Sequence, residues 1–251
     1  MHSSFSPILK WLGVGLACAS LVALVVLTPG GLLRKTDYIG AAVCHRRLSH
    51  SFSIAGRQLP LCQRCSGTFP GALTGVLVHW AVWRRRRSVR FPPWPMFVPM
   101  GIFAGFWALD GLNSTTADAN LNALVQGFFN RPPGVGILGY SPQPELRLFS
   151  GALMGMSMSA ILVPAFNQAV WKDGEDAATI RSWHELGLLA AVEVGMAALI
   201  YLLSSSQSPV ALYAVAIYSA LGVVTMFTFL GAMMFVLVTQ RDAGLVGWRE
   251  A

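Results

Sequence analysis

The sequence predicts an all-α fold, in which about six helices form a transmembrane bundle within one integral membrane domain over residues 1–251. Apolar residues (AVILMFWYC) make up 54% of the chain and charged residues only 12%, about half of the roughly 25% that soluble domains carry. One soluble core of this size cannot bury so much apolar surface, but lipid can cover it. The composition therefore excludes a soluble enzyme, a disordered chain and a coiled coil.

The second observation is that the charged residues fall between long runs that carry almost none. A helix needs about 20 apolar residues to cross the hydrocarbon layer at a rise of about 1.5 Å per residue. A polar stretch over 204–209 divides the last long run into two. The first run is long for a signal peptide, so we expect it to remain as a span. The expected spans are 11–33, 66–83, 91–110, 147–171, 185–203 and 210–239.

Lysine and arginine near the ends of spans predict the orientation. Six spans place both termini on one side, which then holds ten of these residues against eight on the other. Six of the eight lie in 34–65 together with cysteines and histidines, and without them the count is ten to two. We therefore expect cytoplasmic termini in an inner or plasma membrane.

The net charge of +7 is compatible with nucleic-acid binding by itself, but its placement is not. The run Arg84–Arg87 follows a predicted span directly, as cytoplasmic anchors do. No nucleic-acid recognition fold accompanies it. The expected partner is membrane lipid.

Two connections are long, 34–65 and 111–146. Because two predicted spans separate them, both lie on the same membrane face. Loops longer than about 12–15 residues are usually functional or disordered. The second contains an apolar stretch, 120–129, that predicts a short interfacial helix. We expect the functional residues at this face.

Three of the four cysteines lie in the first long connection, in Cys44-His45 and in Cys62-Gln-Arg-Cys65. Proline at position 60 favours a helix start, so Cys62 and Cys65 should share one helix face. The helix dipole and Arg64 both favour thiolates there. Three cysteines and a histidine are a common zinc ligand set. The candidate ligands of zinc or another soft metal are Cys44, His45, Cys62 and Cys65.

Other polar residues are expected at the same depth. Asp110 and Asn113 follow the third span, and Arg147 begins the fourth. Asp110 and His45 are candidates for acid–base catalysis, and Arg147 for contact with an anionic headgroup or product. Arg64 and Asn113 are candidates for cofactor binding. Glu193 lies near the middle of the fifth span, where ionisable residues are costly and usually functional.

These motifs resemble a family of predicted bacterial and archaeal polytopic membrane proteins, known only as a domain of unknown function. The resemblance covers about residues 40–160 and implies a shared site, but it implies no particular reaction. Two positions depart from the family pattern, which usually has Gln where this chain has Arg46 and Arg where it has His50. The segment between Asp110 and Arg147 is longer than in the family, which suggests a docking element for another membrane-protein subunit. The matching pieces are Cys44-His45, Ser51-Phe52, Gly56, Pro60-Leu-Cys-Gln-Arg-Cys-Ser-Gly67, Gly71, Asp110-Gly111, Arg147, Gly151 and Gly155.

Three functions fit these residues. The first is a membrane protein with a Cys/His metal site on the extracytoplasmic face. The second is a thiol–disulfide oxidoreductase coupled to a membrane quinone, in which Cys62 and Cys65 cycle and Cys44 exchanges with them. The third is a non-catalytic subunit of a larger membrane complex. The sequence leaves open whether the protein is an enzyme.

Overall fold

The computed structural model describes residues 26–27, 29–117 and 127–239, and most of them are helical. This confirms the predicted all-α membrane bundle. The principal helices are α2 (Leu32–Ala41), α3 (Gln63–Leu77), α4 (Phe97–Ala117), α6 (Pro144–Val170), α7 (Trp183–Ser204) and α8 (Pro209–Thr239). The strands are very short: β1 (Ser53–Ile54), β2 (Arg57–Gln58), β3 (Ser88–Arg90) and β4 (Glu175–Ala178).

Four segments within the described residues are long and apolar enough to cross a membrane. They correspond to the last four predicted spans. One boundary differs, because the helix expected to end at residue 110 continues to Ala117. The carboxylate of Asp110 pairs with Arg64 inside the protein, so it does not mark the end of the span. The four segments are Trp94–Ala117, Pro144–Val170, Trp183–Ser204 and Pro209–Val236.

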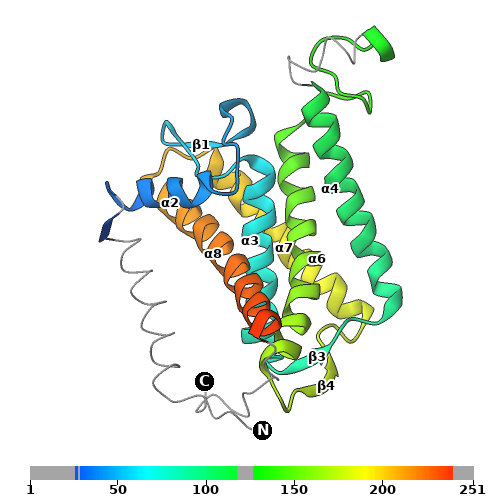
Figure 1. Ribbon diagram of the computed structural model, residues 1–251. Helices are drawn as coiled ribbons and strands as arrows, with labels where there is room; N and C mark the ends of the chain where they lie inside the picture. The colour runs from blue at the N-terminus through cyan, green and yellow to red at the C-terminus, as the bar shows by residue number, and fades with distance from the viewer. Residues whose placement is uncertain (1–25, 28, 118–126, 240–251) are drawn as a thin grey trace.

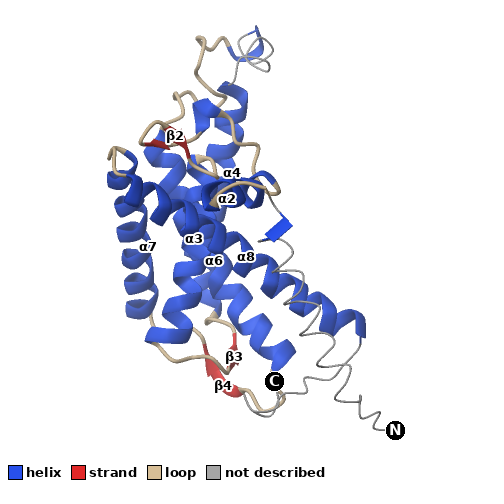
Figure 2. Cartoon of the chain, turned by 90° about the vertical axis from the view of Figure 1, so that its left-hand side faces the viewer, coloured by secondary structure: helices blue, strands red, loops and turns tan. Residues whose placement is uncertain are grey.

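The expected second span is α3 followed by a π-helical turn, Val78–Val82. Most residues of α3 are buried, and the helix packs against α6, α7 and α8 (Figures 1 and 2). The expected first span lies mostly outside the described residues. Of its predicted range, Leu32 and Leu33 belong to α2 instead.

Small residues bring α3 and α6 into close contact. A Cβ on Gly67 would meet the carbonyl oxygen of Leu148, and a Cβ on Gly155 would meet that of Thr68. Glycine spaced four residues apart permits such close approach of helix backbones in membranes. The backbones of α3 and α6 therefore touch along the centre of the bundle.

The two long connections lie at one end of the bundle, as the sequence predicts (Figure 1). The connection 34–65 is more structured than a loop, because it contains α2 and the antiparallel hairpin of β1 and β2. The predicted helix over 120–129 falls largely outside the described residues.

The opposite end carries the parallel pair of β3 and β4 (Figures 1 and 2). The sequence predicts that the nearby run Arg84–Arg87 anchors the chain at the membrane surface, but Arg85 is buried in the protein. Its guanidinium donates to both carboxylate oxygens of Glu185, at 2.5 and 2.8 Å, and to the carbonyl of Thr179. One arginine of the run therefore joins two connections at this end.

Candidate functional site

The chain folds back after α2 so that its two cysteine motifs meet. The end of α2 lies directly against the turn before α3, because a Cβ on Gly40 would meet the carbonyl of Pro60. Cys44 follows α2, with its amide bonded to the carbonyl of Gly40 at 2.9 Å. Cys62 is the N-cap residue of α3. A glycine at position 40 is thus what lets the two motifs approach.

Cys44, His45 and Cys62 form a cluster of candidate metal ligands. The two sulfur atoms and a ring nitrogen of His45 lie within 4.8 Å of one another. Cys44 Sγ is 3.8 Å from His45 Nδ1 and accepts a 3.2 Å hydrogen bond from the amide of Cys62. All three cysteines of the described chain are free thiols. The structure therefore brings together three of the four predicted ligands.

Cys65, the fourth predicted ligand, lies one helical turn beyond Cys62. Hydrogen bonds from the thiols of Cys62 and Cys65 lower the pKa of Cys44. The same bonding to Cys44 raises the pKa of Cys62, and burial adds to the shift. The lowered pKa of Cys44 favours its thiolate form. Thiolate is the form of cysteine that binds metals.

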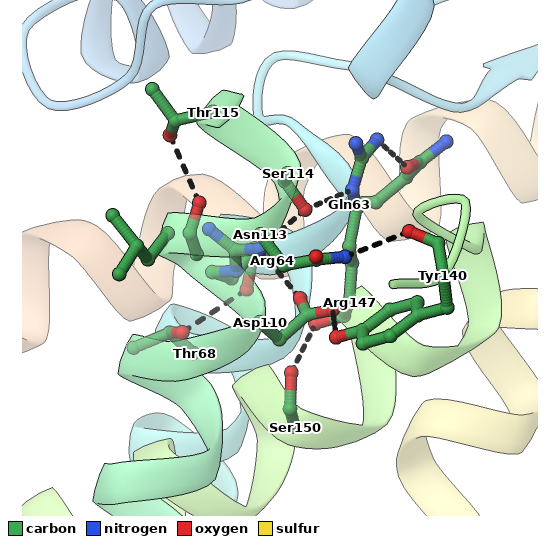
Figure 3. Close-up of polar contacts among 12 residues, drawn as sticks. Gln63, Arg64, Thr68, Asp110, Asn113, Ser114, Thr115, Tyr140, Arg147 and Ser150 are labelled. Carbon is green, nitrogen blue, oxygen red and sulfur yellow. Dashed lines mark hydrogen bonds and ion pairs between the residues drawn. The ribbon is translucent and has the colours of Figure 1, made fainter. Parts of the chain in front are cut away.

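Asp110 is fully buried and is held by two partners (Figure 3). Arg64 of α3 donates to Asp110 Oδ2 at 2.5 Å, and the hydroxyl of Tyr140 donates to Oδ1 at 2.9 Å. Burial and the bond to Asp110 raise the pKa of Tyr140 to about 12. The carboxylate therefore links α3, α4 and the connection before α6.

Arg147 enters the same network from α6. Its Nε donates to Ser114 Oγ at 3.2 Å and its terminal nitrogen to Gln63 Oε1 at 3.0 Å. Arg64 donates to the same Ser114 oxygen at 3.1 Å. Figure 3 shows both arginines reaching this hydroxyl from separate helices. Two guanidinium groups therefore meet at one serine, and Asp110 pairs with one of them.

Asn113 fixes the connection that follows α4. Its side-chain amide donates to the carbonyl of Tyr140 at 3.0 Å and accepts from the amide of Leu138 at 2.9 Å. A Cβ at Gly136 would collide with Asn113, which explains the glycine there. These contacts hold the connection over the end of α4. The role of Asn113 in cofactor binding stays a prediction.

A pocket of about 100 Å³ joins the thiol cluster to the arginine network. It is large enough for more than one water molecule. Neither Asp110 nor Asn113 lines it. The pocket is lined by His45, Arg47, His50, Cys62, Arg64 and Arg147, together with Ser114 and Thr115 of α4.

Sequence reasoning missed three residues of this network. Gln63 stands between the motif residues Cys62 and Arg64, and Ser114 lies one turn after Asp110. Their spacing from recognised residues was an available signal. No sequence signal pointed to Tyr140, because it lies in an irregular glycine-rich connection. Its position depends on tertiary contacts with α4.

Glu193 lies away from this site, in the middle of α7. It is fully buried, and neither carboxylate oxygen has a hydrogen-bond partner among the described residues. A Cβ added at Gly71 of α3 would lie 3.0 Å from its Oε2. The carboxyl group therefore packs against the glycine face of α3.

The family model described as predicted membrane protein (DUF2085) matches residues 44–161. This confirms the resemblance drawn from the sequence motifs. The DUF2085 match begins at Cys44 and ends within α6, so it includes the thiol cluster and the arginine network and leaves out α7 and α8. Comparison with curated proteins gave no match, nor did comparison with solved structures.

Proposed function

We propose that this integral membrane protein binds a soft metal ion, zinc first, through Cys44, His45, Cys62 and Cys65. The observation that carries the proposal is the approach of three ligand atoms to within 4.8 Å of one another. Zinc–sulfur bonds of about 2.3 Å place tetrahedral ligands about 3.8 Å apart. Cys44, His45 and Cys62 therefore need only a small inward movement to bind one ion, and Cys65 is the proposed fourth ligand.

The neighbouring pocket supports a reactive role for the metal. Catalytic zinc sites have three protein ligands and keep the fourth position open to water or substrate. The reactive form of this site would therefore have His45 released from the metal, and the pocket touches both His45 and Cys62. A bound zinc ion would supply Lewis-acid chemistry there. Asp110 is the proposed group for proton transfer, as is His45 when it does not bind the metal. Arg147 is the proposed anion-binding residue.

The proposed location is the extracytoplasmic face of an inner or plasma membrane, with cytoplasmic termini. The excess of lysine and arginine on the side of the termini supports this orientation. The apolar helices place the protein in lipid.

The test is metal analysis of the full-length protein purified in detergent without chelator. We expect one equivalent of zinc in the wild type and its loss in Cys44→Ser and Cys62→Ser. Cys18→Ser is the matched control, because Cys18 lies outside the motif, and this variant should keep the metal. A folded, metal-free preparation with intact thiols that takes up no added zinc contradicts the proposal.

A second candidate is a thiol–disulfide oxidoreductase, which the lowered pKa of Cys44 and the free thiols favour. In this reaction two thiols lose two protons and two electrons to a quinone, which gives one sulfur–sulfur bond and the hydroquinone. Titrating free thiols before and after addition of a soluble quinone tests it. Loss of two thiols per chain, reversed by dithiothreitol, supports this candidate, and an unchanged count excludes it.

A further inference from the structure

The pocket beside the thiol cluster is lined mainly by basic residues. Arg47 and His50 reach it from the first long connection, and Arg64 and Arg147 from α3 and α6. None of the described residues that line it is an aspartate or a glutamate. Its composition therefore favours an anionic ligand over a cationic or apolar one.

Two of the arginines that line the pocket, Arg64 and Arg147, are held in place by other side chains of the protein. Arg147 is 6% exposed, and Ser114 and Gln63 fix its guanidinium. Arg64 is fixed by Asp110 and by the same Ser114. Two guanidinium groups that converge on one serine repel each other, and an anion in the pocket would reduce that repulsion.

The volume of the pocket and the side chains that line it indicate the class of anion more closely. A volume of about 100 Å³ suits a compact group rather than an extended chain. Arginine presents a fork of donors that matches carboxylate and phosphate oxygens. The serine and threonine hydroxyls of α4 line the same pocket.

We propose that this pocket binds a phosphate group, either free inorganic phosphate or the phosphomonoester headgroup of a lipid. The phosphate oxygens take hydrogen bonds from Arg47, Arg64 and Arg147. The part of the proposal that places phosphate next to a metal rests on the proposed function. The binding of phosphate by the arginines does not rest on it.

The experiment titrates inorganic phosphate into full-length protein in detergent and measures the heat of binding by isothermal titration calorimetry. We expect saturable binding that Arg47→Gln weakens about tenfold, which corresponds to about 1.4 kcal/mol, because the variant loses a charge-assisted hydrogen bond to the phosphate. Arg47 is exposed, so its replacement should leave the fold intact. Arg147→Lys, which keeps the charge but loses the fork, should weaken binding as well.

The control is Arg90→Gln. Arg90 pairs with Asp176 in the opposite part of the bundle, so its replacement should leave phosphate affinity unchanged. Equal affinities for Arg47→Gln and Arg90→Gln, or no saturable binding by folded wild type, overturn the proposal.

A second arm separates the two sources of phosphate. The titration is repeated in nanodiscs of phosphatidylcholine alone and of phosphatidylcholine with phosphatidic acid. Weaker apparent binding of inorganic phosphate in the discs with phosphatidic acid assigns the pocket to a lipid headgroup. Equal binding in both discs assigns it to free phosphate.

Zinc content is measured on the same preparations, so that the two proposals fail separately. Zinc without phosphate binding overturns the pocket assignment and leaves the metal site standing. Phosphate binding without zinc removes the metal proposal and supports the arginine pocket alone.

Discussion

Tyr140 holds the connection before α6 against α4. Its hydroxyl bonds Asp110 and its carbonyl accepts from Asn113, so one residue joins the glycine-rich connection to two positions of α4. Asp110 in turn pairs with Arg64. The buried carboxylate is therefore satisfied only while the connection stays in place.

Replacing Tyr140 with phenylalanine should lower stability in a manner that depends on pH. A hydrogen bond from a hydroxyl to a carboxylate is worth about 1.5–3 kcal/mol. The pKa of Tyr140 is raised from 10.0 to about 12 by burial and by the bond to Asp110. A raised pKa stabilises the fold fully below about pH 10, and this contribution disappears as the pH rises towards 12.

Thermal unfolding of both proteins in detergent, measured from neutral pH to about pH 12, checks this. The difference between wild type and Tyr140→Phe should be constant up to about pH 10 and then shrink. A difference that grows at high pH would contradict the assigned contact.

Glu193 leads to a different expectation. A polar group buried without a hydrogen bond costs about 1–3 kcal/mol in proteins, and neither oxygen of Glu193 has a partner among the described residues. Glu193→Met, which has a similar length, should therefore raise the unfolding temperature. Glu185→Met is the contrasting variant. The carboxylate of Glu185 pairs with Arg85, so this replacement should lower the unfolding temperature. Destabilisation by Glu193→Met would show that the carboxyl group has a partner.

At the scale of elements, contact between α3 and α6 depends on glycine. Gly155→Leu should destabilise the bundle by about 1–3 kcal/mol or prevent folding, because the added side chain meets the backbone of α3. Gly101→Leu in α4 is the matched control, since nothing lies within 4 Å of its added Cβ. Unfolding of both variants in the same detergent gives the comparison, and equal effects would refute close packing at Gly155.

The limits of sequence reasoning also appear at this scale. Long apolar runs predict α6, α7 and α8 to within a few residues, because lipid imposes the length of a span. The end of α4 was predicted too early, because Asp110 was assigned to the membrane boundary while its charge is paired with Arg64. Arg85 was assigned to an anchor for the same reason, since its partner Glu185 is far away in the sequence. Pairing across the fold is invisible to local charge patterns.

In the candidate site, too, contacts between residues far apart in the sequence could not be predicted from local patterns. The cysteine motifs were recognisable because metal ligands have characteristic types and spacing. The role of Ser114 as a shared acceptor was not, because it requires α3 and α6 to converge on α4. Residue type indicated the ligands, whereas helix packing decided which polar groups meet.

For the whole molecule, the orientation in the membrane is testable. With cytoplasmic termini, a green fluorescent protein fused after Ala251 should fluoresce in cells, and alkaline phosphatase fused there should be inactive. The matched fusion of alkaline phosphatase at Gln207, in the exposed connection between α7 and α8, should be active. The reverse pattern would place the thiol cluster in the cytoplasm and contradict the charge argument.

Adjacent residues in the first turn of α3 contact different parts of the site. Cys62 and Cys65 face the thiol cluster, Gln63 holds Arg147, and Arg64 holds Asp110. Each residue of a helix is rotated by about 100° from the last. Adding or deleting a single residue between Cys65 and Gly67 would therefore rotate all four side chains relative to the rest of α3 and away from their partners. Amino-acid exchanges can change this turn one contact at a time, but a change in its length cannot.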